Sequence, residues 1–315
     1  MGLLEGKVAV VSGAARGQGR AHALRLAREG ADIIAIDICA DIDTVDYPLA
    51  TPEDLDDTVA QVELLGRRVA ASENDVRDAT AVAAAIDTGV AKLGRLDIVV
   101  ANAGIATYDA ADTMSAQSWR DMIDTNLTGV WTVCRGAMPH MIEDGRGGAM
   151  VLISSVAAHV GMLHLSHYSA AKAGVVGLMR ALAVELAPHM IRVNTIHPTS
   201  VNTAMIINEA TYDLLVPGAG PAARHGAQKV PDEVAQRSRA STPCPSRGQS
   251  PRTSARRSSS WYPKAAATSA VPSSASTRGR RPSRRSLQSV SSERNALGLS
   301  CQRGPAKSYQ ACADC

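Results

Sequence analysis

The segment Met150–Gly174, MVLISSVAAHVGMLHLSHYSAAKAG, decides the fold because it joins a buried strand to a helix through a polar turn. Residues 150–153 are apolar without alternation, which is typical of a parallel strand covered on both faces. The strand stops at Ser154 and Ser155, and the carboxyl ends of parallel strands are where such sheets bind ligands. The segment therefore predicts an α/β fold with reactive residues at one edge of the sheet.

Three side chains of this segment form a candidate catalytic group. A helix predicted over residues 168–185 places Tyr168 and Lys172 on one face, because they are four positions apart. A free phenol ionises near pH ~10, and a neighbouring ammonium favours the phenolate, so Tyr168 is a candidate general base. Ser155 can hydrogen-bond the same substrate oxygen while a hydride moves at the attached carbon. A chance YxxxK pattern is the alternative interpretation.

A glycine-rich turn follows the first predicted strand, residues 7–11. The sequence SGAARGQGR at 12–20 then opens a helix that runs to Glu29. Glycines there let the backbone approach a pyrophosphate, whose charge is met by the helix N-terminus. The candidate cofactor-binding residues of this turn are Gly13, Arg16, Gly17, Gln18 and Gly19.

Asp37 ends the second predicted strand, residues 32–36. It follows the glycines by about 20 residues, where an acidic side chain can accept hydrogen bonds from both hydroxyls of the adenosine ribose and would repel a 2′-phosphate. The sequence thus favours NAD over NADP, whereas Arg16 is a feature that favours NADP. A solvated loop charge is the alternative interpretation of Asp37.

Further candidates lie in the connections after the next strands. Residues 38–56 form an acidic connection longer than the usual ~2 to 6 residues of such loops, which suggests a flap. A strand around residues 68–71 leads to Asp75 and Val76. Asp75 either accepts a hydrogen bond from the adenine amino group or is an ordinary turn residue.

A fourth strand and a long helix carry the next candidates. The strand at 96–101 ends in small residues that allow close approach of a cofactor, namely Asn102, Ala103 and Gly104. The helix is predicted over residues 118–143 and contains Asn126. Asparagine is a poor residue for the middle of a helix, because its side chain competes for backbone hydrogen bonds. A local kink or a proton-relay role would explain it.

A sixth strand is predicted over residues 191–196, before the sequence HPTSVNT at 197–203. Val201 and Thr203 of this sequence are candidates for binding the nicotinamide amide. The eight histidines form no metal-binding pattern, so no metal is expected. The histidines interpreted as loop residues, one of which could line a substrate pocket, are His159, His164 and His167.

The composition changes along the chain and indicates two segments. Residues 1–230 carry 18 Lys and Arg against 26 Asp and Glu, and they are long enough for one domain with a sizeable core. Residues 231–315 carry 15 Lys and Arg against 4 Asp and Glu, with 19 Ser, 13 Arg and 8 Pro but only six Ile, Leu, Val or Met. Such a tail cannot bury enough apolar surface to offset its ordering entropy, so disorder is predicted.

The sequence also bears on location. No apolar run approaches the ~18 residues of a membrane span, and MGLLEGKVAVV lacks the basic start and cleavage site of a signal peptide. Cys39 and Cys134 are the only cysteines before residue 231, which suits a reducing compartment. We therefore expect a cytoplasmic protein without a membrane partner.

Taken in order, these motifs make residues 7–205 resemble the short-chain dehydrogenase/reductase family. The matching positions are Gly13, Gly17, Gly19, Asp75, Asn102, Ala103, Gly104, Asn126, Ser155, Tyr168, Lys172, Asn194, Pro198 and Thr203. The resemblance implies a Rossmann fold with a doubly wound parallel sheet, and usually a homotetramer. It also implies a Ser-Tyr-Lys site in which Tyr168 and Lys172 contact the cofactor and Asn126 holds a water relay.

Two features resemble one subgroup of that family. The long connection after Asp37, and Thr199 where the broader family usually has glycine, are similar to the actinobacterial carveol-dehydrogenase-like proteins. That resemblance implies tightly held NAD and cyclic or terpenoid secondary alcohols as substrates. It also implies a redox partner linked to mycofactocin.

The family's last helix and strand are not visible after Val230. Reading each codon one nucleotide earlier permits Tyr-Ile-Ser-Gly within residues 267–271 and Val-Asp-Ala-Gly within 275–279. We therefore interpret residues 231–315 as the same gene read out of frame. The chain as written is expected to be poorly stable and largely inactive.

The sequence has three functional interpretations. The leading one is an NAD-dependent dehydrogenase that interconverts a secondary alcohol and its ketone. The alternative is a dinucleotide-binding pseudoenzyme, impaired because the last strand is missing. A third is a nucleic-acid-binding module based on the Arg- and Ser-rich tail, whose affinity would fall steeply with salt. A frameshift in GC-rich DNA produces such a composition without selection, so no nucleic-acid partner is expected.

Overall fold

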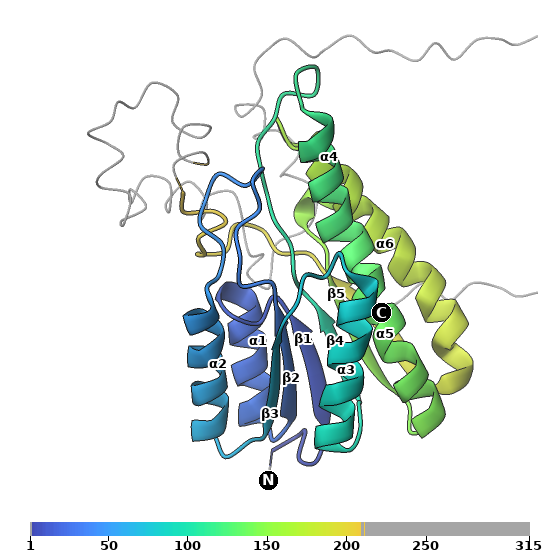
Figure 1. Ribbon diagram of the computed structural model, residues 1–315. Helices are drawn as coiled ribbons and strands as arrows, with labels where there is room; N and C mark the ends of the chain where they lie inside the picture. Colours follow the sequence, from blue (N-terminus) through green and yellow to red (C-terminus); the bar gives the residue numbers. More distant parts are fainter. Residues whose placement is uncertain (1, 209–210, 212–315) are drawn as a thin grey trace, which may run out of the picture. The chain divides into compact units, whose positions relative to one another are not determined.

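Within the residues that the structure describes, six parallel strands form one sheet in the order β3-β2-β1-β4-β5-β6 (Figure 1). The computed structural model describes residues 2–208 and residue 211. The strands are β1 (Val8–Ser12), β2 (Asp32–Asp37), β3 (Val69–Glu73), β4 (Ile98–Ala101), β5 (Gly148–Ile153) and β6 (Ile191–Ile196). The strand order reverses between β1 and β4, which confirms the predicted doubly wound fold and creates a crevice at the carboxyl edge.

Helices connect the strands within the described residues. They are α1 (Gly17–Arg28), α2 (Pro52–Leu64), α3 (Ala79–Leu93), α4 (Ala116–Ile123), α5 (Gly129–Asp144) and α6 (Ser166–Leu186). A π-helix at Asp124–Thr128 joins α4 to α5, and a 3-10 turn at Val156–Ala158 follows β5. Among the helices that the structure describes, none is both long and apolar enough to cross a bilayer.

The strands separate two apolar layers, because neighbouring residues of a strand point to opposite faces. On β1, Val8 and Val10 belong to the layer that includes α3, α5 and α6, whereas Ala9 and Val11 belong to the layer that includes α1 and α2. Figure 1 shows these two groups of helices on opposite sides of the sheet. The unalternating apolar strands of the sequence therefore reflect burial on both faces, as predicted.

Strand β6 is buried on one face only. Ile191 and Val193 are 2% and 5% exposed and pack in the layer of α6. The intervening residues are exposed, and Ile196 shows 45% of its surface to solvent. In the part of the chain that the structure describes, β6 pairs with β5 and forms one end of the sheet.

Capping residues mark where several helices begin and end. Thr51 and Asp54 form a reciprocal capping box at the start of α2, which stabilises a helix N-terminus by typically ~1 kcal/mol. Asp78 accepts hydrogen bonds from the amides of Thr80 and Ala81 and begins α3, a helix that the sequence reasoning did not predict. Gly94 ends α3 in a left-handed conformation with φ of 94°, which glycine adopts without strain.

The helix predicted over 118–143 is confirmed as a continuous helical segment from Ala116 to Asp144, but not as one regular α-helix. The structure divides it into α4, the π-helix and α5, and Asn126 lies inside the π-helix. The suspected local irregularity at this asparagine is therefore confirmed. The predictions made for residues 231–315, and for the end of the 1–230 domain, lie outside the described residues.

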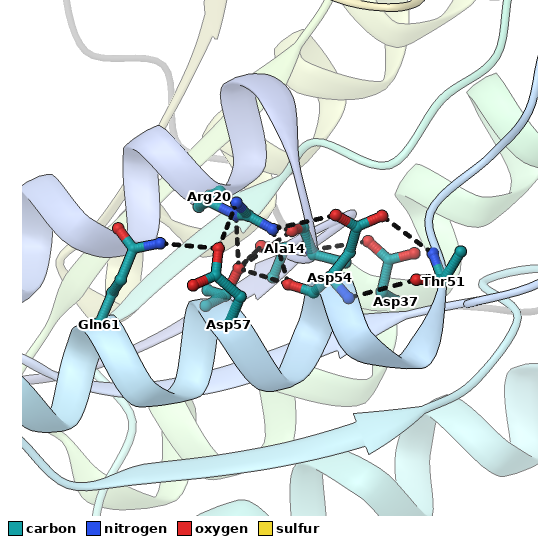
Figure 2. Close-up of polar contacts among 9 residues, drawn as sticks. Ala14, Arg20, Asp37, Thr51, Asp54, Asp57 and Gln61 are labelled. Atoms are coloured by element: carbon teal, nitrogen blue, oxygen red, sulfur yellow. Dashed lines mark hydrogen bonds and ion pairs between the residues drawn. The ribbon is translucent and has the colours of Figure 1, made fainter.

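Arg20 of α1 ties the glycine-rich turn to α2 (Figure 2). Its Nε donates to the Ala15 carbonyl at 2.8 Å and to the Thr58 hydroxyl at 2.9 Å. Its terminal nitrogens reach Asp57 at 2.7 Å and the Asp54 carbonyl at 2.7 Å. The turn and the second helix are thus held together by one guanidinium, which fixes the backbone at one end of the crevice.

Candidate active site

The glycine-rich turn leaves space and free donors at the crevice. Gly13 and Gly17 have φ of 66° and 56°, and a Cβ on Gly13 would lie 2.9 Å from the Ala103 Cα. Arg16 is the N-cap residue of α1, and no side chain among the described residues caps the helix there. The first turn of α1 holds no acidic side chain. Unpaired amides at a helix N-terminus attract an anion. The turn therefore fits a pyrophosphate.

Asp37 lies at the end of β2 with 6% of its surface exposed. Its Oδ2 accepts from the Ala15 amide at 2.8 Å, and its Oδ1 accepts from the Cys39 amide at 3.3 Å. Burial raises the pKa of this carboxyl, while the backbone hydrogen bonds and the charge of Arg16 oppose the shift. The remaining lone pairs face a cleft where ribose hydroxyls could donate, and where a phosphate would meet a carboxyl group.

The predicted cofactor residues line two adjoining clefts. The first is lined by Gly13, Arg16, Gly17, Gln18, Gly19, Asp37, Asp75, Val76, Asn102, Ala103, Gly104 and Thr203. The second is lined by Gln18, Ser155, Tyr168, Lys172, Val201 and Thr203. Because Gln18 and Thr203 belong to both, a ligand in the first cleft can extend toward Tyr168 in the second.

Asp75 is engaged by a neighbouring arginine. The amide of Arg77 donates to Asp75 Oδ1 at 2.8 Å, and the guanidinium donates to Oδ2 at 2.7 Å. The same guanidinium contacts Asp121 of α4 at 2.9 Å, and the Thr44 hydroxyl donates to that carboxylate at 2.9 Å. Asp75 thus acts as a turn residue and also lines the first cleft, so the two interpretations of the sequence are compatible.

The segment after β4 is held against β1. Asn102 donates from its side chain to the carbonyls of Ser12 and Gly13 at 3.0 and 3.3 Å. Its backbone amide donates to the Ser12 hydroxyl at 3.0 Å. A Cβ on Gly104 would lie 2.5 Å from Asn126 Oδ1 and 3.4 Å from Lys172 Nζ. Only glycine leaves the space between these two polar groups.

Asn126 is fully buried, and its side chain hydrogen-bonds to Ile105, which follows β4, and to Met122 of α4. Its Nδ2 donates to the carbonyl of Ile105 at 3.0 Å and to that of Met122 at 3.1 Å, while its Oδ1 accepts from the Ile105 amide at 3.3 Å. π-Helical turns are rare and are frequent at functional sites. The π-helix therefore aims Asn126 at the segment that follows β4.

Ser155, Tyr168 and Lys172 converge at the carboxyl end of β5. Lys172 is 3% exposed, donates to the Ile153 carbonyl at 2.9 Å, and places Nζ 5.6 Å from the centroid of the Tyr168 ring. Ser155 Oγ accepts from the Ala157 amide at 3.1 Å, which leaves the hydroxyl proton available. The three side chains share one cleft, as the spacing predicted.

The pKa values of the pair depend mainly on burial. Burial raises the pKa of Tyr168, and hydrogen bonding with Ser155 lowers it. Burial lowers the pKa of Lys172 to about 8. The sequence reasoning credited the ammonium with lowering the phenol's pKa, but desolvation works against that effect and also disfavours the charged lysine.

The sequence missed several residues of the clefts. Tyr47, in the long connection after Asp37, is 6% exposed, and its hydroxyl accepts from the Ala106 amide at 3.2 Å. Ile42 of the same connection packs with Ile105 and partly buried Tyr168. Contacts across so many residues leave no local signal. The predicted flap is a segment that lines the first cleft.

His167 is not a loop residue, contrary to the prediction. It lies in the first turn of α6, is fully buried, and places Nε2 at 2.9 Å from the Thr107 hydroxyl. Burial lowers its pKa, and the nearby Asp109 opposes the shift. The helix begins two residues earlier than predicted, which draws this ring into the interior.

Known proteins resemble this chain over most of the described part. The family profile of short chain dehydrogenases matches residues 7–213. A (-)-trans-carveol dehydrogenase from Rhodococcus erythropolis is 53% identical over 218 residues, which are 69% of this chain and 79% of that protein.

Two solved structures are also similar. The carveol dehydrogenase from Mycobacterium avium in complex with NAD has a TM-score of 0.69 at 51% identity, over 72% of this chain and 84% of that one. A short chain dehydrogenase from Mycobacterium paratuberculosis bound to NAD has a TM-score of 0.65 at 45% identity, over 75% of this chain and 83% of that one. The chain belongs to the short-chain dehydrogenase family.

Proposed function

We propose that this protein is an NAD-dependent dehydrogenase that interconverts a secondary alcohol, cyclic or terpenoid-like, and its ketone. The observation that carries the proposal is the meeting of Ser155, Tyr168 and Lys172 in a cleft that adjoins the glycine-rich crevice. Relatives named as carveol dehydrogenases, one of them in complex with NAD, support the same reaction class.

The chain's own residues move the proton and hold the reacting oxygen. Bound NAD supplies the acceptor for the hydride that leaves the carbinol carbon. Tyr168 accepts the hydroxyl proton as the alcohol is oxidised and returns it when the ketone is reduced. Ser155 donates a hydrogen bond to the same oxygen, and such preorganised donors stabilise charge that develops on an oxygen. Lys172 would hold the ribose, and its ammonium favours the phenolate against the opposing effect of burial on Tyr168.

Asn126 acts as a fixed support for proton exchange with solvent in this proposal. Its side chain faces Lys172 across the space left by Gly104, and a water there could link the two groups. The fixed hydrogen bonds from Asn126 to Ile105 support such a role, because a relay requires donors and acceptors in constant positions.

The cofactor assignment rests on both ends of the first cleft. Unpaired amides of α1 suit the pyrophosphate, and Asp37 suits the two ribose hydroxyls of NAD. Val76 and Asp75 would flank the adenine, while Val201 and Thr203 would hold the nicotinamide amide. The substrate assignment rests on the second cleft, because much of its lining is apolar and suits a cyclic hydrocarbon. The apolar lining residues include Val156, Met162, Leu165, Met205 and Ile206.

The test is turnover by the purified full chain with NAD and carveol or another cyclic secondary alcohol, followed by the absorbance of the reduced nicotinamide. A version with the frame of residues 231–315 corrected is assayed beside it. Oxidation by either version supports the proposal. If both bind NAD and neither oxidises any secondary alcohol offered, the pseudoenzyme alternative holds instead.

We also propose a cytoplasmic homotetramer that passes electrons to a mycofactocin-linked partner. Trp119 and Trp131 on α4 and α5 are 42% and 39% exposed, which supports burial of this surface in an assembly. The proposal of a redox partner rests on the subgroup resemblance alone. Light scattering tests the assembly, and a monomer at micromolar concentration would contradict it.

For residues 231–315 we propose an out-of-frame, disordered tail after a domain of residues 1–230. The family match over residues 7–213 and the change in composition support this division. The nucleotide sequence between codons 205 and 260 tests it, together with a mass spectrum of the native protein. The proposal would be contradicted if the native protein contains residues 231–315 as written and this segment resists limited proteolysis.

A further inference from the structure

The main chain around Ser155 is held by the segment that follows β6. The Ser154 amide donates to the Ile196 carbonyl at 2.9 Å, and the Val156 amide donates to the Pro198 carbonyl at 3.1 Å. The β5–β6 ladder thus continues beyond the ends of both strands. In this register the amide of position 198 would donate to the Ser154 carbonyl, but Pro198 has no N–H.

The side chain of His197 provides a donor to the next carbonyl, that of Ser155. Its Nδ1 lies 3.1 Å from the Ser155 carbonyl oxygen, and its Nε2 lies 2.9 Å from the Thr195 hydroxyl. A carbonyl oxygen only accepts hydrogen bonds, so Nδ1 must carry the proton. In the neutral ring, Nε2 then accepts from the Thr195 hydroxyl, and the tautomer is fixed by both partners.

A second histidine supports the same ring. The His159 and His197 rings have centroids 4.6 Å apart and planes inclined by 46°. His159 directly follows the 3-10 turn Val156–Ala158, whose first residue follows Ser155. The His197 ring therefore contacts the chain on both sides of that short turn.

We propose that His197 is a positioning residue for Ser155. The Nδ1–H bond fixes the carbonyl of Ser155, and the Ala157 amide fixes its Oγ. With carbonyl and side chain both held, the free hydroxyl proton points at the substrate oxygen. The expected effect on turnover rests on the proposed dehydrogenase function. The tautomer of His197 can be tested without that function.

Two substitutions separate the two nitrogen atoms. His197→Asn keeps an N–H donor on the atom bonded to Cγ, where Nδ1 stood. His197→Gln moves the donor one bond further, to the place of Nε2. We expect kcat within about threefold of the unsubstituted chain for His197→Asn and a loss of about tenfold for His197→Gln, since one hydrogen bond is typically worth ~0.5 to 1.5 kcal/mol.

The matched control is His140→Gln, the same chemical change on α5, where the ring contacts Asp87 outside both clefts. It should leave kcat unchanged. The KM for NAD should not change in any of the three variants, because His197 lines neither cleft. Circular dichroism verifies that each variant is folded. Equal kcat losses for Asn and Gln, or full kcat in His197→Gln, would overturn the proposal.

The tautomer of His197 can be measured without turnover, from nitrogen-15 NMR spectra of the histidine rings in the unsubstituted full chain. The His197 signals are identified by their absence in His197→Gln. The Nδ1–H tautomer supports the placement, whereas the Nε2–H tautomer overturns it. If no alcohol is oxidised, the proposed function fails while this spectrum still decides where the His197 proton lies.

Discussion

Strands β2 and β6 differ in how they are covered. Ile36 near the end of β2 is fully buried, whereas Ile196 at the end of β6 is 45% exposed. The residues of β2 pack in both apolar layers, and Arg20 ties the glycine-rich turn to α2 (Figure 2). At the β6 end, the described residues bury only the face in the layer of α6. The candidate catalytic groups other than Ser155 come from α6 and the π-helix, which belong to the layer that covers both strands.

Replacing Tyr168 should have the largest effect and should separate chemistry from fold. Tyr168→Phe removes the proton acceptor but keeps the buried ring, and general acid-base assistance is worth ~10²- to 10⁴-fold in rate. Stopped-flow or steady-state turnover measures the loss, and NAD titration calorimetry should change little. Retention of more than about a tenth of the activity would count against Tyr168 as the base.

Asp37→Ala should weaken NAD binding by roughly tenfold or more, because hydrogen bonds to charged groups contribute ~1.5 to 3 kcal/mol. The preference for NAD over NADP should narrow, since the carboxylate no longer opposes a 2′-phosphate. Calorimetry with both cofactors measures each affinity. The control is Asp56→Ala, which removes an exposed carboxylate outside the cofactor cleft. Equal or stronger NADP binding by the unsubstituted chain would refute the assignment.

Two substitutions on β6 sharpen the contrast between its faces. Val193→Ala should lower the free energy of unfolding by about 2 kcal/mol, because the side chain is buried against α6. Ile196→Ala removes more carbon but should cost under about 1 kcal/mol, because its surface is already partly in water. Urea unfolding gives both values. A larger cost for Ile196→Ala would mean that this face is covered in solution.

Arg20→Ala should have a small effect, under about 1 kcal/mol of stability, because its partners are partly exposed and such pairs contribute little. It should also weaken NAD binding slightly by loosening the glycine-rich turn. The control is Arg25→Ala, whose exposed pair with Glu29 on the same helix should be worth under ~0.5 kcal/mol. Indistinguishable melting curves for the two variants would remove the structural role given to Arg20.

The sequence allowed the six strands and the convergence of Ser155, Tyr168 and Lys172 to be predicted, because apolar runs and helical spacing are local signals. It did not predict α3, whose alanine-rich sequence has little contrast between faces. The start of α6 was placed too late, so His167 was misjudged. The contacts of Tyr47 with Ala106 and of Lys172 with Ile153 join distant segments, and only the folded chain reveals them.

The π-helix between α4 and α5 has a consequence for how this protein can vary. It holds more residues per turn than an α-helix, so deleting one residue from Asp124–Thr128 would let a regular helix form. Because the wide turn already absorbs the extra residue, the deletion would leave α4 and α5 nearly in their present orientation and would change the direction of the side chains within the turn. Asn126 would then leave Ile105. A regular helix here and the present position of the Asn126 side chain therefore exclude each other.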